Sequence, residues 1–413
     1  MNIAALKYAP STKGEVQVAV SKEEFEMLYE GARRFINEKL RPLEDQLEKD
    51  DGLAPELWAD LTAQSLELGL LNAHLPEEMG GGGLTFTQLV ELAALFGHTS
   101  WRFSYLLARA NSLMLRCTPQ QKVDYLEPVM AGTKVQCFAI SEPEAGSFTS
   151  GLKTRAVKVE GGWRITGTKH WISNGRLADF AIVIAVTDQK EGGRPEATAF
   201  FVDKGTPGFS VGAHMELIGF RGVEERELIF DDCFVSDDKV LGEVGKGLDL
   251  GFSFIAERRL FLSAYCVGVM DELIGLSVNY MGNRTVQGGL LSKKQGIQWK
   301  IADMETDYVA ARSVVRAAAE RCESDLRNAP ELAASVAASV IKDVSIAKFL
   351  STTAVNRVAD QAVQIHGGVG LSKGYAVERF FRDVRPTRIM DGTDEMHREI
   401  IAREVIRSRS SSR

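Results

Sequence analysis

Hydrophobic and polar positions divide the chain into three zones that differ in period. In the first zone, residues 22–132, apolar side chains recur at helical spacing, as at Phe25, Leu28, Tyr29 and Ala32. Polar residues fill the positions between them, so each predicted helix has one face for a core. The pattern predicts an N-terminal helical domain over residues 1–134.

In the middle zone the period shortens to two. Apolar residues alternate with polar ones on both sides of the pair Gly161-Gly162, which is typical of a β-hairpin. Short apolar segments bounded by Gly, Pro or Asp predict further strands at residues 181–186, 199–202 and 227–230. No helices alternate with these strands, so the zone predicts an antiparallel β-domain over residues 135–245.

The helical period returns in the third zone, in long segments with few prolines. Apolar stripes run through residues 273–280, 301–311, 344–353 and 396–405. The third of these helices is expected to stop at Gly367-Gly368, because glycine is the preferred residue just beyond a helix C-terminus. The four helices predict a bundle over residues 246–413. The fold class is therefore α+β, in the order helical domain, β-domain, four-helix bundle.

Composition and charge limit the cellular compartment and the kinds of partner that we expect. The 413 residues are 45% apolar and 25% charged, which excludes a disordered chain, and the net charge of −7 argues against a nucleic-acid partner. Five cysteines without a CxxC pair indicate free thiols in a reducing compartment. No run approaches the ~18 apolar residues of a membrane span, and no signal peptide is recognisable. We therefore expect a cytoplasmic protein with no membrane span.

Several kinds of active site are excluded by their missing motifs. The six histidines each stand alone, without an HxxxH or HExxH spacing, so no metal site is expected. There is no GxSxG elbow, and no GxGxxG follows a predicted strand, which argues against a nicotinamide site. The glycines at residues 80–83 lack the Lys-Ser/Thr of a phosphate loop and indicate a link between helices.

Four other segments are modest individually. Residues 140–147 combine a proline with glycine and small hydroxyls, and residues 167–175 place Trp171 near the hydroxyl of Ser173. Arg284 near a bundle helix suits a pyrophosphate, which arginine can bind bidentately. Residues 364–370 form a glycine-rich stretch followed by charged residues. Alone, each has an ordinary interpretation: a turn, a core tryptophan, a surface arginine or a helix end.

The fourth segment ends with the strongest candidate for chemistry. Asp391 precedes a glycine just before the last predicted helix, beside the apolar residues Ile389 and Met390. A carboxylate in such a place would be desolvated, which makes it a better base. An isolated Asp-Gly pair is otherwise a turn.

In this order and spacing, the four segments resemble the acyl-CoA dehydrogenase family of flavoproteins. The resemblance covers about residues 22–407 and includes the order of the domains. It implies bound FAD, an acyl-CoA substrate, and a homotetramer or homodimer in which a neighbouring subunit completes each flavin site. It also implies a role in fatty acid metabolism, with an electron-transfer flavoprotein as the electron acceptor.

The resemblance assigns roles residue by residue. Residues that match the flavin's surroundings within one chain are Phe138, Ile140, Ser141, Ser147, Trp171, Ser173, Thr393 and Glu395. Residues that match contacts to a partner subunit's FAD are Arg284, Gln295, Gln364, Gly367 and Gly368. Residues that match contacts to acyl-CoA are Ser147, Arg259 and Gly392. Asp391 stands where most members carry a glutamate, which removes the α-proton while the β-hydrogen leaves as hydride to flavin N5.

The aspartate leaves three alternatives open. Its side chain is shorter than that of glutamate by one C–C bond, about 1.5 Å. Family members with an aspartate at this position resemble three subgroups: dehydrogenases of alicyclic acyl-CoA, nitroalkane oxidases and a branch that acts on 4-hydroxyacyl-CoA. Arg398, seven residues on, suits a nitroalkane oxidase but is also common among the dehydrogenases. Some relatives place the base on the first bundle helix near Glu257, although an ungapped count puts Arg258 there. A non-catalytic, flavin-bound homologue with a binding role is the third alternative.

Overall fold

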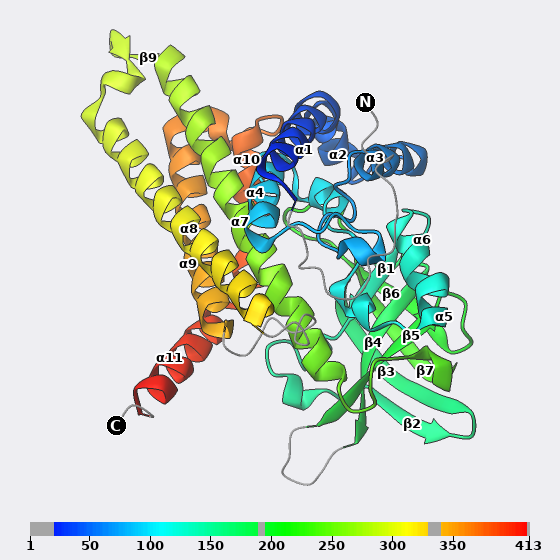
Figure 1. Ribbon diagram of the computed structural model, residues 1–413. Helices are drawn as coiled ribbons and strands as arrows, with labels where there is room; N and C mark the ends of the chain where they lie inside the picture. Colours follow the sequence, from blue (N-terminus) through cyan, green and yellow to red (C-terminus); the bar gives the residue numbers. More distant parts are fainter. Residues whose placement is uncertain (1–19, 189–194, 329–339, 411–413) are drawn as a thin grey trace.

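The computed structural model describes residues 20–188, 195–328 and 340–410. The first N-terminal helices lie near the upper part of a long helical bundle, and the last two lie beside the β-domain, which itself lies beside the lower part of the bundle (Figure 1). The N-terminal helices are α1 (Lys22–Phe35), α2 (Glu44–Asp50), α3 (Pro55–Glu67), α4 (Phe86–Phe96), α5 (Pro119–Gln121) and α6 (Glu127–Met130). A 3₁₀ segment, η5 (Trp101–Leu106), follows α4.

The middle domain is an eight-stranded sheet. Its strands are β1 (Gln136–Ala139), β2 (Arg155–Val159), β3 (Gly162–Ser173), β4 (Phe180–Asp188), β5 (Glu196–Asp203), β6 (Phe209–Met215), β7 (Glu225–Ser236) and β8 (Val240–Leu241). The strand order is β6-β7-β3-β2-β4-β5-β8, and β1 pairs with β4. The predicted hairpin is β2–β3, with Val159 opposite Gly162.

The prediction of a purely antiparallel sheet is wrong at one place. Both β1 and β2 pair with β4 in parallel, while the other strand pairs are antiparallel. The chain that leads from each of these strands to β4 contains β3, which allows this, because parallel neighbours need a crossover and cannot be joined by a tight turn. β4 is consequently central and buried on both faces, which explains its nearly continuous apolar sequence.

The bundle consists of α7 (Gly247–Asn283), α8 (Gln295–Asn328), α9 (Ile341–His366), α10 (Ala376–Val384) and α11 (Asp394–Ser410), with a small hairpin of β9 (Thr285–Val286) and β10 (Gly289–Leu290). As predicted, α9 ends directly before Gly367, whose φ of 62° favours glycine. The N-terminal helices and the bundle share one hydrophobic core, since α4 and α7 cross closely at Gly97 and Gly268. A Cβ on Gly268 would lie 1.7 Å from the Ala94 carbonyl oxygen.

Helix α7 differs from the expectation that no segment is apolar enough to cross a membrane. By length and composition an 18-residue window of this helix would suffice. In the structure 67% of that window is buried within the molecule, and α4, α8 and α9 pack around the helix. A central core helix is apolar on all sides for this reason.

Asp383 on α10 links the bundle to the β-domain, and its raised pKa predicts that the stability of the protein depends on pH. The backbone N–H of Phe220 donates to its carboxylate at 2.7 Å, and burial raises the pKa of Asp383 to about 6 from an ordinary 3.8. The folded chain therefore binds this proton more tightly than the unfolded chain does. The stability contributed by the protonated form is lost as pH rises through about 6.

We expect Asp383→Asn to be more stable than the native protein above pH 6, by up to ~3 kcal/mol, and about equally stable near pH 4. Asparagine keeps an oxygen for the Phe220 N–H but cannot ionise. Urea unfolding at pH 4, 5, 6 and 7 measures the difference. A difference that does not change with pH would show that Asp383 does not titrate in this range.

Candidate functional site

Asp391 lies in a strained turn between Arg388 and the first residue of α11. Its φ is 52°, in the left-handed region, and Gly392 follows with a φ of 103°. Two buried cations hold the turn by its carbonyl oxygens. Arg259 Nε donates to the Asp391 oxygen at 2.7 Å, and Lys348 Nζ donates to the Gly392 oxygen at 2.6 Å. The backbone is thus fixed from α7 and from α9 at once.

The residues after the turn anchor the start of α11. Arg388 Nε donates to one Asp394 oxygen at 2.6 Å, and Lys348 Nζ lies 4.0 Å from the other. The Thr393 hydroxyl accepts the Met396 N–H at 3.3 Å, as an N-cap does. Asp394 is buried in the first helical turn, where a negative charge is favoured by the helix dipole. The residues predicted for the site do not include Asp394, Lys348 or Arg388.

The Asp391 carboxylate itself is left without a partner. Its Oδ2 is buried and accepts no hydrogen bond from any described residue. The neighbouring Arg259 is 5% exposed, and although burial lowers its pKa to about 10, it stays a cation at neutral pH. Because Arg259 bonds the carbonyl oxygen of Asp391, it leaves Oδ2 free to accept a hydrogen bond or a proton. An unpartnered buried acid is costly and is typical of a functional site.

Trp171 is not a core tryptophan. It is 54% exposed, has a φ of 59°, and lies where the pairing of β3 with β7 is irregular, between Lys169 and Ile172. Such irregularities re-aim side chains beside functional sites. The His170 ring packs edge-on against the indole at 5.0 Å, and His170 Nδ1 is buried with no described partner. The strand thus presents a bare aromatic face next to an unsatisfied polar atom.

Ser173 connects this strand to an acid that sequence reasoning missed. Its hydroxyl donates to Glu225 Oε1 at 2.5 Å across the β3–β7 pair, while Glu225 Oε2 is buried without a described partner. Burial raises the pKa of Glu225, and the charge of Asp391 raises it further. No motif marks Glu225, so only the register of the two strands could have found it.

Residues 140–147 and 167–175 come together as neighbours. The Ser141 carbonyl oxygen accepts the His170 N–H at 2.9 Å. Lys169 is fully buried and donates to Glu142 at 2.8 Å and to the Ile140 carbonyl at 2.9 Å. Glu142 also accepts the backbone N–H groups of Lys153 and Thr154, at 2.6 and 3.0 Å. A buried ion pair therefore fastens the segment after β1 to the strand that carries Trp171.

The other predicted flavin contacts of these segments differ in exposure. Ile140 is buried and Phe138 partly buried, and the Phe138 ring packs edge-on against Phe254 of α7 at 5.2 Å. Ser141 is half-buried, whereas Ser147 is exposed in the loop that follows. At the other end of the site, Thr393 is half-buried and Glu395 exposed on α11. Gly392 lies against Arg259, because a Cβ there would be 3.2 Å from the Arg259 side chain.

A second group of predicted residues gathers at the opposite end of the bundle. Arg284 directly follows α7, Gln295 begins α8, and the end of α9 is close by, since Tyr280 stacks on His366 at 4.4 Å. The exposed residues of this group are Arg284, Gln295, Gln364, Gly367 and Gly368. Along α7, Arg284 is 25 residues from Arg259, roughly 37 Å at the helical rise. One chain therefore does not bring this group to Asp391.

The residues of two remaining alternatives have other described neighbours. Arg258 lines a recess beside η5, and Glu257 and Arg258 both act on the pKa of His74, so Glu257 as the base stays a prediction. Arg398 stacks on Phe349, with its guanidinium 4.7 Å from the ring centroid, and makes no described contact with Asp391. The Asp–Arg pair expected of a nitroalkane oxidase is absent from the described residues.

The residues around Trp171 fit a flavin. An exposed aromatic face suits a flat ring system, and the unsatisfied atoms of His170 and Glu225 suit its polar edge. The Ser173 hydroxyl, two residues after Trp171, donates to Glu225 and can also accept a hydrogen bond. Among the described residues no cluster of His, Cys, Asp and Glu could hold a metal ion, and the five cysteines are free and buried.

Comparison with known proteins agrees with this arrangement over almost the whole chain. Three family models match: the acyl-CoA dehydrogenase N-terminal domain over residues 22–133, the middle domain over 137–233 and the C-terminal domain over 245–406. The chain is 32% identical to the acryloyl-CoA reductase (NADH) of Anaerotignum propionicum, over 97% of this chain and 99% of that protein.

Solved structures give the same result. The butyryl-CoA dehydrogenase of Megasphaera elsdenii superposes with a TM-score of 0.84 and 29% identity, over 95% of this chain and 100% of that chain. An acyl-CoA dehydrogenase of Bacillus anthracis complexed with FAD gives 0.85 and 29%, over 95% of this chain and 69% of that chain. The chain therefore belongs to the acyl-CoA dehydrogenase family, whose members are FAD-dependent oxidoreductases acting on acyl-CoA.

Proposed function

We propose that this protein oxidises the Cα–Cβ bond of an acyl-CoA thioester, with Asp391 as the base that takes the α-proton. The observation that carries the proposal is the unpartnered Oδ2 of Asp391, held on a turn that Arg259 and Lys348 fix. FAD, when bound, supplies the acceptor for the β-hydrogen, which leaves as hydride. Trp171 and Ser173 would hold the flavin ring.

The chain's own groups can prepare both partners of the proton transfer. The Asp391 N–H donates no hydrogen bond to a described backbone group, so it can polarise a thioester carbonyl and acidify the α-carbon. The buried cations Arg259 and Lys348 lie beside the turn and favour the negative charge that develops on the thioester oxygen as the α-proton leaves. Burial holds the pKa of His397 to about 3, so this histidine stays neutral and does not compete for the proton.

Two groups of contacts belong to the same proposal. Within one chain Phe138, Ile140, Ser141, Ser147, Thr393 and Glu395 would contact FAD, and Arg259, Gly392 and Ser147 would contact acyl-CoA. The exposed group at the far end of the bundle would complete the flavin site of a neighbouring subunit. This is supported by the roughly 37 Å along α7 that separates that group from Asp391.

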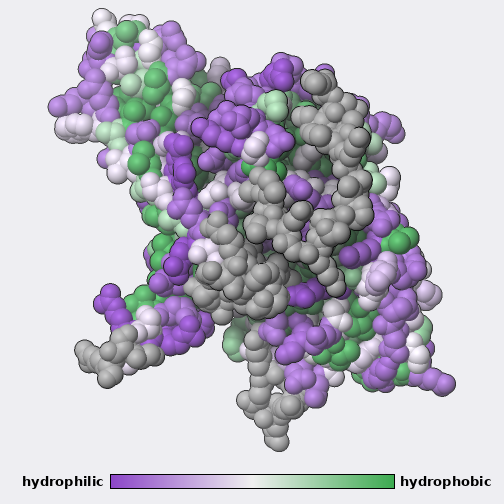
Figure 2. Space-filling view, viewed as in Figure 1, coloured by the Kyte–Doolittle hydropathy of each residue, from purple (hydrophilic) through white to green (hydrophobic). Residues whose placement is uncertain are grey.

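We also propose a homotetramer or homodimer that works in the cytoplasm and passes electrons to an electron-transfer flavoprotein. Hydrophobic residues gather on the arm formed by the far ends of α7 and α8 (Figure 2), where Val278, Leu290 and Trp299 are exposed. Exposed apolar patches of this kind mark interaction surfaces. We further propose domain boundaries at residues 134/135 and 245/246.

Anaerobic titration of the FAD-loaded protein tests the function. We expect at least one member of a panel of straight, branched and alicyclic acyl-CoA thioesters to bleach the flavin absorbance, because the two electrons removed from the substrate stay on the flavin. Nitroethane with release of peroxide, and no response to any thioester, would instead indicate a nitroalkane oxidase. A yellow protein that neither reagent bleaches would indicate a binding role.

A further inference from the structure

Glu225 is an acid of the site that the proposed chemistry does not use, and no cation compensates it. Its Oε1 accepts the Ser173 hydroxyl at 2.5 Å, and its Oε2 is buried without a described partner. In the part of the chain that the structure describes, Glu225 makes no ion pair, and no positive charge acts on its pKa. A carboxylate withdrawn from water without a cation is costly, and such a group takes up a proton instead.

The preceding residue, Glu224, shows where the nearby cations go. Arg176 Nε donates to both Glu224 oxygens at 2.8 Å, and Arg226 Nε donates to one of them at 3.1 Å. The bond from Arg176 is the largest cause of the lowered pKa of Glu224. Burial is the largest cause of the raised pKa of Glu225, and the bond from Ser173 opposes that shift without cancelling it. Two adjacent glutamates thus differ: Glu224 favours the ionised form and Glu225 the protonated form.

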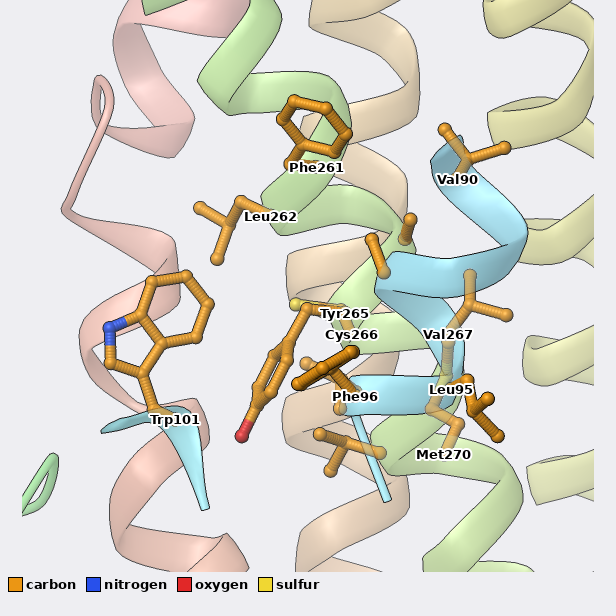
Figure 3. Packing of buried hydrophobic residues seen from close by; sticks show 14 of the residues in the cluster. Val90, Leu95, Phe96, Trp101, Phe261, Leu262, Tyr265, Cys266, Val267 and Met270 are labelled. Atoms are coloured by element: carbon orange, nitrogen blue, oxygen red, sulfur yellow. The ribbon is translucent and has the colours of Figure 1, made fainter. Parts of the chain in front are cut away.

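Packing holds Glu225 opposite Ser173. The two residues are directly paired in the register of β3 and β7. In the loop before β7, Phe220 stacks on Trp101 of η5 at 5.0 Å, and Trp101 packs edge-on against Tyr265 of α7 at 4.7 Å. Figure 3 shows Trp101 and Tyr265 within this hydrophobic cluster. The end of β7 that carries Glu225 is therefore fixed by the core rather than by charge.

Two other titratable groups influence the pair, and neither is a cation. The phenol of Tyr105 on η5 has its pKa raised by burial first and by the charge of Glu225 next, so it stays a neutral O–H at pH 7. The other group is Asp391, whose negative charge raises the pKa of Glu225 after burial. Both influences favour a proton on Glu225.

We propose that Glu225 is a neutral carboxylic acid with its proton on Oε2, and that it positions Ser173 by accepting the hydroxyl hydrogen on Oε1. The inference rests on the proposed contact of Ser173 with FAD and adds a positioning residue to it. A hydroxyl has one hydrogen to donate, so Ser173 offers the flavin ring only lone pairs. Reduction adds N–H donors to that ring, and an accepting oxygen therefore favours the reduced form. A neutral Glu225 also keeps negative charge away from a ring that gains electrons.

Infrared difference spectroscopy of the FAD-loaded protein tests the proton on Glu225. The native spectrum minus the Glu225→Gln spectrum at pH 7 should contain the C=O band of a protonated carboxyl group. Glu227→Gln, two residues further along β7, is the matched control and should lose no such band. If Glu225→Gln loses the bands of an ionised carboxylate instead, the proposal is overturned.

The midpoint potential of the bound flavin tests the positioning of Ser173. Glutamine is neutral and keeps an oxygen for the hydroxyl, so Glu225→Gln should retain the native potential, and a raised potential would contradict a neutral Glu225. Glu225→Met removes the acceptor, and at a fixed potential the ratio of reduced to oxidised flavin should fall by up to ~10-fold, about 30 mV for a two-electron couple. In a Ser173→Ala background, Glu225→Met should have no further effect, because Glu225 acts through Ser173.

These outcomes do not depend on the oxidation of acyl-CoA, because no thioester is added. If no thioester bleaches the flavin, the proposed function fails while the proton and the potential of this site are still decided. A native potential in Glu225→Met, or in Ser173→Ala, would overturn the inference and leave the role of Asp391 intact. Flavin content and thermal midpoint confirm that each variant is folded.

Discussion

Replacing Asp391 with asparagine is expected to slow flavin bleaching by the true acyl-CoA substrate by at least ~10²–10⁴-fold, the usual contribution of a general base. The amide cannot accept the α-proton. The turn should survive, because asparagine tolerates the left-handed conformation that Asp391 adopts at a φ of 52°. Arg259 and Lys348 bond backbone carbonyls, and those bonds do not depend on the side chain. Stopped-flow absorbance under anaerobic conditions measures the rate.

Two comparisons make the result specific. The Asp391→Asn protein should keep its yellow FAD, so the flavin spectrum and content serve as the internal check. Glu399→Gln removes an exposed acid from α11 and should leave the rate unchanged. If Asp391→Asn bleaches at the native rate, the base lies elsewhere and the unpartnered oxygen has another purpose.

Glu142→Gln is expected to destabilise the protein by about 3–5 kcal/mol, the usual effect of removing one member of a buried ion pair. Lys169 is fully buried, and burial lowers its pKa to about 8 even though Glu142 raises it, so Glu142→Gln removes the carboxylate that compensates the buried cation. Glutamine can accept hydrogen bonds through one oxygen only, whereas Glu142 accepts from Lys169, Lys153 and Thr154 with two. The segment after β1 should loosen, and FAD affinity should fall with it.

Glu144→Gln provides the matched control, two residues away. Glu144 also pairs with a lysine, Lys153, but both side chains are more than 70% exposed. Surface pairs contribute little, so we expect no measurable change in the urea midpoint or in FAD affinity. Equal effects of the two substitutions would show that the Glu142–Lys169 pair does not hold this segment.

The position of Glu225 shows the limit of sequence reasoning about the site. Trp171, Ser173 and Asp391 stand in segments with a recognisable order, and in the structure Ser173 donates to an acid, Glu225, whose pKa is raised by burial first and by the charge of Asp391 further. That acid stands in an ordinary strand sequence, where alternation predicts only which face it takes. Its role depends on β7 pairing with β3 in one register, and register is set by contacts far apart in the chain.

Lys348 and Arg258 illustrate the same limit in helices. Helical spacing predicts which positions face a neighbour, but Lys348 stands between two apolar residues and Arg258 between two charged ones, and neither pattern indicates the contact that the side chain makes. Lys348 is buried because α9 packs against the start of α11, where its ammonium reaches the Gly392 carbonyl. Arg258 is distinguished from Arg259 only by the direction in which α7 presents each side chain.

By itself the sequence determined the α–β–α order, the hairpin at Gly161-Gly162, the end of α9 at Gly367 and the turn at Asp391, because periodicity and glycine act over a few residues. Tertiary structure alone decided the parallel pairing with β4, the exposure of Trp171 and the cations around the turn. These features depend on packing between segments that are distant in the sequence, and a local pattern does not indicate which distant segments pack together.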